Sequence, residues 1–138
     1  MIVVDASVMT DYLLRRPPAV EAVAEILAGD DTEPLHAPDL IEPEIMNALR
    51  QMTTRGAVTV EQASEAVLDL AETRIIRYQH PPLRARVWEL RDQLTAYDAM
   101  YLALAEGLQA RLLLTADRGL AARAGASLGE DRVRHLRV

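Results

Sequence analysis

The chain has 138 residues, a net charge of −6 and no cysteine. This length predicts a single domain over residues 1–138. The lack of cysteine excludes a disulfide framework and the usual structural zinc sites, and the acidic balance argues against a dedicated DNA-binding protein. The first residues lack the features of a signal peptide, and no apolar run approaches the roughly 20 residues of a membrane span. We therefore expect a cytoplasmic protein without a membrane segment.

The charge is unevenly distributed along the chain. Residues 1–72 carry 14 acids and 4 arginines, whereas residues 73–138 carry 7 acids and 11 arginines. The simplest interpretation is ordinary solvated surface. The functional alternative is an acidic region that holds cations beside a basic region that contacts phosphates.

Short apolar runs alternate with helical patterns along the chain. The β-branched run at 2–4 predicts a buried strand, and the spacing of Thr59 and Gln62 is typical of a capping box that opens a helix. In chain order we predict a strand at 2–4, helices at 6–15 and 19–29, a loop at 30–34, a strand at 35–37, helices at 40–56 and 59–71, a strand at 75–78, helices at 82–94 and 97–107, a strand at 111–116, a helix at 117–125 and an edge strand at 132–138. This alternation predicts an α/β domain with a mostly parallel sheet that helices cover on both faces.

Four acids follow or flank the predicted strands. Asp5 comes directly after the first strand, and Asp117 lies just past the fourth. Glu44 is on the helix after the second strand, and Asp98 opens the helix before the fourth. Ligands of parallel α/β sheets bind outside the carboxyl ends of the strands, so the four carboxylates could converge. Asp98 also interrupts an apolar run at 96–104, where a carboxylate is costly unless it is hydrogen-bonded, paired or bound to a metal.

Each of these acids also has a purely structural interpretation. Aspartate at a helix start is a favoured N-cap, and a glutamate on a helix is commonly solvated. The polar neighbours Ser7 and Thr115 could be caps as well, and Asn47 could be a surface amide. Three similarly placed aspartates, together with a glutamate whose helix face also carries Asn47, favour a shared site over independent caps. Carboxylates without cysteine or paired histidine suit Mg²⁺ or Mn²⁺, which can activate water against a phosphodiester.

Four segments together resemble the PIN-domain ribonucleases, and among them the VapC-type toxins of toxin–antitoxin pairs. They are "IVVDASV", "EIMNAL", "AYDAMYLALA" and "LLTADRGL", and they occur in order along nearly the whole chain. The resemblance implies a PIN-like three-layer sandwich on a mostly parallel sheet of four or five strands. It also implies endonucleolytic RNA cleavage by a metal-activated water, a homodimer and a cognate antitoxin. By the same resemblance, the acids that are catalytic and hold Mg²⁺ or Mn²⁺ would be Asp5, Glu44, Asp98 and Asp117, with Ser7, Asn47 and Thr115 in support.

Two other functions remain as alternatives. A non-catalytic PIN-like module could bind RNA or a protein without cutting, although the intact set of acids argues against it. A phosphoryl-accepting receiver domain also gathers acids at strand ends, but it usually needs a late lysine, and this chain has no lysine. With no phenylalanine and one tryptophan, the sequence predicts little base stacking, so that substrate choice would depend on shape and phosphate contacts.

Overall fold

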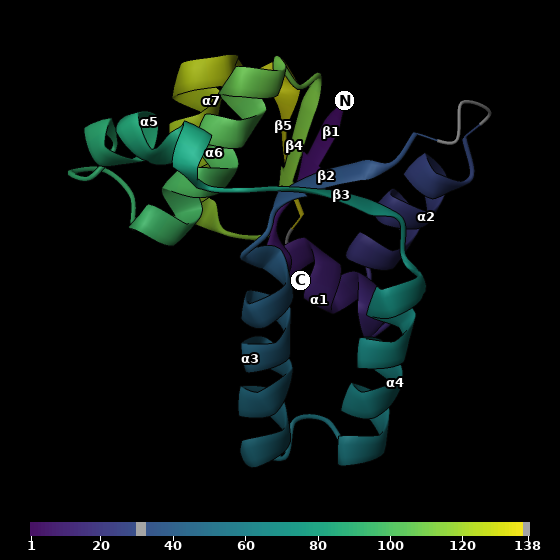
Figure 1. Ribbon diagram of the computed structural model, residues 1–138. Helices are drawn as coiled ribbons and strands as arrows, with labels where there is room; N and C mark the ends of the chain where they lie inside the picture. The colour runs from purple at the N-terminus through teal and green to yellow at the C-terminus, as the bar shows by residue number, and fades with distance from the viewer. Residues whose placement is uncertain (30–32, 137–138) are drawn as a thin grey trace.

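A computed structural model describes residues 1–29 and 33–136 of the chain. Its centre is a five-stranded sheet in the order β3-β2-β1-β4-β5 (Figure 1). All four neighbouring pairs are parallel. The strands are β1 (Ile2–Val4), β2 (Leu35–Pro38), β3 (Ile75–Tyr78), β4 (Leu112–Thr115) and β5 (Val133–His135). The predicted parallel α/β sheet and the edge position of the last strand are therefore confirmed.

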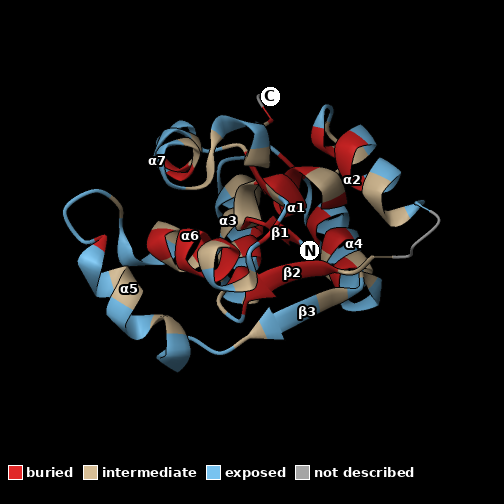
Figure 2. Ribbon diagram, turned by 90° about the horizontal axis from the view of Figure 1, so that it is seen from above, coloured by how far each residue is buried: buried red, intermediate tan, exposed pale blue. Residues whose placement is uncertain are grey.

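Helices cover both faces of this sheet, which gives the predicted three-layer arrangement (Figure 2). Helices α6 and α7 lie on one side with α5 outside them, and α1 and α2 lie on the other. Helices α3 and α4 run side by side and project from the body (Figure 1). The helices are α1 (Ala6–Leu13), α2 (Ala19–Leu27), α3 (Ile41–Thr54), α4 (Val60–Glu72), α5 (Arg84–Glu89), α6 (Ala96–Leu108) and α7 (Arg118–Leu128), with short 3-10 turns at η1 (Pro81–Leu83) and η2 (Glu130–Arg132).

The predicted continuous helix over 82–94 is wrong. Two adjacent prolines start a 3-10 turn, and α5 then ends after six residues. The backbone N–H of Leu90 closes α5 by bonding the carbonyls of both Arg86 and Val87. Leu90 is buried whereas α5 itself contains no fully buried residue, so the chain turns inward here because burial of this leucine competes with further helix. The predicted loop over 30–34 and strand over 132–138 extend partly onto residues 30–32 and 137–138, which lie outside the described residues.

The core explains why β1 and α6 are so apolar. Strand β1 is fully buried because it lies in the middle of the sheet with helices on both faces. Helix α6 contacts β1, β2 and β4 on one side and α5 and α7 on others, so its apolar residues occupy most of its circumference. This packing fixes the carboxyl ends of β1 and β4 relative to the start of α6. Within residues 1–29 and 33–136, no helix is both long enough and apolar enough to cross a membrane.

Candidate active site at the carboxyl edge of the sheet

Asp5 lies at the junction of β1 and α1, where three donors fix its carboxylate. It is the N-cap of α1, and its Oδ1 accepts hydrogen bonds from the Val8 backbone N–H at 3.0 Å and the Ser7 hydroxyl at 2.6 Å. Its Oδ2 accepts a hydrogen bond from the Thr115 hydroxyl. Only 4% of Asp5 is exposed. Both oxygens are therefore engaged inside the protein, as a buried carboxylate requires.

The same hydroxyls connect this junction to the end of β4. Ser7 Oγ accepts a hydrogen bond from the Ala116 backbone N–H at 3.0 Å, and Thr115 Oγ1 accepts one from the Asp117 backbone N–H at 2.9 Å. Asp117 is exposed and caps α7, because its Oδ1 accepts from the Leu120 backbone N–H at 2.8 Å. The structure thus brings Asp5, Asp117 and the predicted supporting residues Ser7 and Thr115 into one hydrogen-bonded unit.

Glu44 reaches the same edge from α3. Pro43 lies in the first turn of this helix, where its missing N–H costs nothing, and the helix continues through the Glu44 backbone N–H to Leu40. The Glu44 carboxylate accepts a hydrogen bond from the Tyr101 hydroxyl of α6 at 2.6 Å. Tyr101 is buried, and burial is the main reason that its pKa is raised, so it remains a donor. Sequence reasoning missed Tyr101, although its spacing of three residues from Asp98 places both on one face of α6.

Asp98 is not a helix cap. Thr95 caps α6, because its side chain accepts from the Asp98 backbone N–H at 3.2 Å. The Asp98 carboxylate is half-buried and accepts no hydrogen bond from any residue that the structure describes. The cap interpretation therefore holds for Asp5 and Asp117 and fails for Asp98. Asp98 still lies in the first turn of α6, where a negative charge interacts favourably with the helix dipole, but this role does not need a half-buried carboxylate.

Asn47 has no hydrogen bond to these side chains among the described residues. It is exposed on α3, and its Oδ1 accepts a hydrogen bond from Arg50 Nε at 3.4 Å. Among the hydrogen bonds of the described residues, none joins Asn47 to the four acids. Its supporting role therefore stays a prediction from the resemblance.

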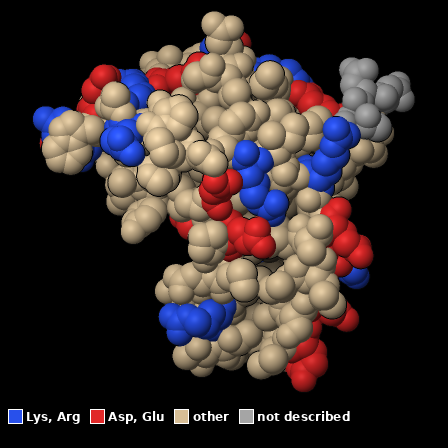
Figure 3. All heavy atoms as spheres, viewed as in Figure 1, with Lys and Arg blue, Asp and Glu red and all other residues tan. Residues whose placement is uncertain are grey.

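The acids influence one another electrostatically. Burial raises the pKa of Asp5, against the lowering effect of its hydrogen bonds, and the charge of Asp117 raises it further. Burial also raises the pKa of Glu44, to which the charges of Asp98 and Asp5 add. The pKa of Asp98 rises to about 6, first through burial and then through Asp117 and Asp5. Figure 3 shows acidic side chains gathered between the body and the α3–α4 pair. The four carboxylates therefore share one region of unfavourable negative charge.

This donor set fits a hydrated divalent cation rather than a closed metal cage. Among the residues described, no three Asp, Glu, His or Cys side chains are close enough to surround one ion. Repulsion between carboxylates acts over longer distances than direct ligation, which explains why the acids are coupled without forming a cage. Mg²⁺ keeps several waters and needs only one or two carboxylates, and hard oxygen donors are the ligands that it prefers.

The fold and the position of these acids can now be compared with known protein families. The chain belongs to the PIN domain family, which matches residues 2–126. Ribonuclease VapC9 of Mycobacterium tuberculosis is 38% identical over 117 residues, which cover 85% of this chain and 86% of that protein. Ribonuclease VapC3 of the same organism is 38% identical over 122 residues, covering 87% and 85% of the two chains. Ribonuclease VapC12 is 36% identical over 121 residues, covering 88% and 90%. Within the family, the chain is therefore similar to VapC ribonucleases.

Proposed function

We propose that this protein is a Mg²⁺- or Mn²⁺-dependent endoribonuclease that acts as the toxin of a toxin–antitoxin pair. The observation that carries the proposal is the set of acids beside the ends of β1 and β4, where burial raises the pKa of Asp5, Glu44 and Asp98 and the charges of neighbouring acids raise it further. Such repulsion opposes folding unless a positive charge offsets it. The similarity to VapC ribonucleases supplies the substrate class, RNA.

The residues of the site would have different tasks. Asp5, Glu44, Asp98 and Asp117 would hold one or two divalent cations. Such a cation would offset their charge, activate water and stabilise the charge that develops on the scissile phosphate. Ser7 and Thr115 keep the Asp5 carboxylate oriented, and Tyr101 does the same for Glu44. The half-buried Asp98 accepts no hydrogen bond from the described residues, so both of its carboxylate oxygens are available to an external ligand.

An RNA cleavage assay tests this function. We expect cleavage with Mg²⁺ or Mn²⁺, none in EDTA, and a loss on the order of 10²–10³ in rate for Asp5→Asn and for Asp98→Asn, since each removes a charge that holds the cation in the transition state. The control is Asp131→Asn, which removes an exposed aspartate in η2, on the amino side of β5 and away from the carboxyl edge. Full activity of either site variant, or cleavage in EDTA, would refute the assignment.

The alternative is a module that binds RNA without cutting it. Binding alone does not need an aspartate with a pKa near 6 in a half-buried position, because that charge repels phosphate and destabilises the fold. Wild-type protein that binds RNA but leaves it intact in Mg²⁺ and in Mn²⁺ would favour this alternative.

We further propose that the protein forms a homodimer and binds a cognate antitoxin over the acidic edge. None of the four acids takes part in an ion pair among the described residues, so an arginine of the antitoxin could supply the missing positive charge. Expression of the protein alone should arrest bacterial growth, and co-expression of the neighbouring gene should relieve the arrest. Harmless expression of the folded wild-type protein would contradict this proposal, and a monomer in sedimentation would contradict the dimer.

A further inference from the structure

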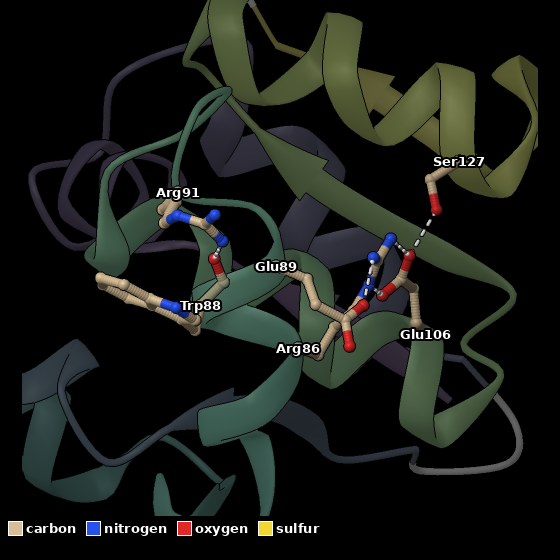
Figure 4. Close-up of polar contacts among 6 residues, drawn as sticks. All are labelled: Arg86, Trp88, Glu89, Arg91, Glu106 and Ser127. Atoms are coloured by element: carbon tan, nitrogen blue, oxygen red, sulfur yellow. Dashed lines mark hydrogen bonds and ion pairs between the residues drawn. The ribbon is translucent and has the colours of Figure 1, made fainter.

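The only tryptophan of the chain is on the surface rather than in the core. Trp88 on α5 is 68% exposed, and the guanidinium of Arg91 lies over its ring at 4.9 Å from the centroid. Arg91 Nη1 also donates a hydrogen bond to the Trp88 carbonyl at 2.9 Å, which holds the arginine in place (Figure 4). Because the guanidinium contacts the ring while most of Trp88 stays in solvent, the pair presents a flat, cationic surface that the described residues leave largely uncovered.

Helix α5 is fixed from its other side. Arg86 donates two hydrogen bonds to the Glu106 carboxylate, from Nε at 2.8 Å and from Nη2 at 3.0 Å, and a third from Nη1 to Glu89 at 3.1 Å. Glu106 also accepts a hydrogen bond from the Ser127 hydroxyl of α7 at 2.5 Å. Figure 4 shows this network on one side of α5 and Trp88 on the other. The bidentate contact therefore orients a helix that has no fully buried residue, and with it the tryptophan.

A shallow hollow lies beside this surface. Its lining is mostly apolar with two basic groups at its side, and includes His80, Pro81, Arg84, Val87, Trp88 and Met100. Met100 belongs to α6, so the hollow lies between α5 and this helix, and none of the four acids lines it. Tyr97, directly before Asp98, is a second exposed aromatic residue, at 61%. Arg84 forms none of the ion pairs found among residues 1–29 and 33–136, which leaves its charge available.

We propose that Trp88 stacks against a base of single-stranded RNA that binds along this hollow. The inference rests on the proposed function. Aromatic stacking contributes about 1–3 kcal/mol per base, and arginine adds both charge and a stacking plane. An apolar hollow whose lining includes Arg84, beside the exposed pair of Trp88 and Arg91, suits a polyanion with flat bases. The expectation of little base stacking came from the small number of aromatic residues in the sequence. The structure shows that the only tryptophan is exposed, so that it can stack with one base.

The tryptophan is also its own reporter. In EDTA, a short single-stranded RNA should quench Trp88 fluorescence saturably. In an assay with labelled RNA, Trp88→Ala should weaken binding by roughly 5- to 100-fold, which corresponds to the loss of one stacked base. Trp88→Phe should restore most of the affinity, because a phenyl ring still stacks. In Mg²⁺, Trp88→Ala should raise KM and leave kcat nearly unchanged.

A matched control and two opposing results decide the inference. Leu68→Ala removes a comparably exposed apolar side chain, 69% exposed on α4, and should leave RNA affinity unchanged. Unquenched fluorescence with RNA bound, or equal affinity of Trp88→Ala and wild type, would overturn the proposal. Without RNA, Trp88 fluorescence could instead change with protein concentration while sedimentation shows self-association. That result would assign this surface to a second copy of the chain and would also overturn the proposal. Cleavage without quenching would refute only this inference, whereas quenching without cleavage would refute only the proposed function.

Discussion

Asp5 and Asp98 lie at the same acidic edge of the sheet, but they differ in burial and in hydrogen bonding. Asp5 is buried, and donors from the backbone and two hydroxyls fix both of its oxygens. Asp98 is half-buried, accepts no hydrogen bond from the residues described, and has its pKa raised to about 6. The comparison shows that donors of the protein itself fix one acid and leave the other without a hydrogen bond from the described residues, and it is this second acid that we propose a charge from outside stabilises.

The largest loss of stability is expected for Thr115→Val, which removes one of the donors that hold Asp5. The substitution keeps the shape and the strand preference of the residue but removes the hydroxyl that donates to Asp5 and accepts from the Asp117 backbone N–H. Because Thr115 is fully buried, the unpaired groups should cost about 1–3 kcal/mol of unfolding free energy, measured by urea denaturation.

Thr10→Val is the matched control for this substitution. Thr10 is also buried, but its hydroxyl only donates to the Ala6 carbonyl within α1, so its removal leaves no buried donor unpaired. It should cost less than about 1 kcal/mol. Equal losses for the two variants would mean that the hydroxyl of Thr115 has no special part in holding Asp5.

Tyr101→Phe tests Glu44, which accepts one hydrogen bond and therefore lies between Asp5 and Asp98 in how firmly the protein holds it. The variant loses a 2.6 Å hydrogen bond, but water can reach the half-buried carboxylate, so the expected cost is about 1 kcal/mol. This hydrogen bond lowers the pKa of Glu44, so its loss should raise that pKa and shift the acid limb of the cleavage profile to higher pH. Tyr97→Phe changes an exposed tyrosine of the same helix and should leave both stability and the pH profile unaltered. An unshifted profile in Tyr101→Phe would contradict the orienting role of Tyr101.

The smallest predicted effect is the pH dependence of the unfolding free energy that arises from Asp98. Its folded-state pKa of about 6 lies above the ordinary value of 3.8, so the folded protein binds this proton more tightly than the unfolded chain. The contribution to stability is therefore complete below pH 3.8 and is lost as pH rises through about 6. In EDTA at pH 7, Asp98→Asn should be more stable than wild type by up to about 1 kcal/mol after solvent screening. In thermal melts, the difference in stability between Asp98→Asn and wild type should become smaller by pH 5. A difference that stays constant with pH would argue against a titrating Asp98.

Much of this site could be predicted from sequence because it depends on one general property of parallel sheets. Acids that follow strands lie at the carboxyl edge, and this alone placed Asp5 and Asp117 together. The apolar run around Asp98 drew attention to this acid, and the structure shows that it is half-buried and is not the cap of α6. The supporting roles of Ser7 and Thr115 are expected only from the resemblance to PIN-domain ribonucleases, and the structure shows both residues donating to Asp5.

The features that escaped prediction depend on contacts between distant parts of the chain. Tyr101 and Glu44 are 57 residues apart, and nothing local to either shows that they meet. The end of α5 at Glu89 depends on burial of Leu90, and the exposed position of Trp88 depends on how Arg86 holds α5 against Glu106. Helical pattern alone predicts continuation through this segment and cannot show which side of it faces solvent.

The shared metal site is tested most directly by four melting curves: wild type and Asp98→Asn, each in EDTA and in Mg²⁺ at neutral pH. In EDTA, the variant should melt at a higher temperature than wild type, because one of the repelling charges is gone. Mg²⁺ at about 100 times its dissociation constant should stabilise wild type by about 2.7 kcal/mol and the variant by less. If Mg²⁺ shifts both proteins equally, or shifts neither, Asp98 does not belong to a shared cation site.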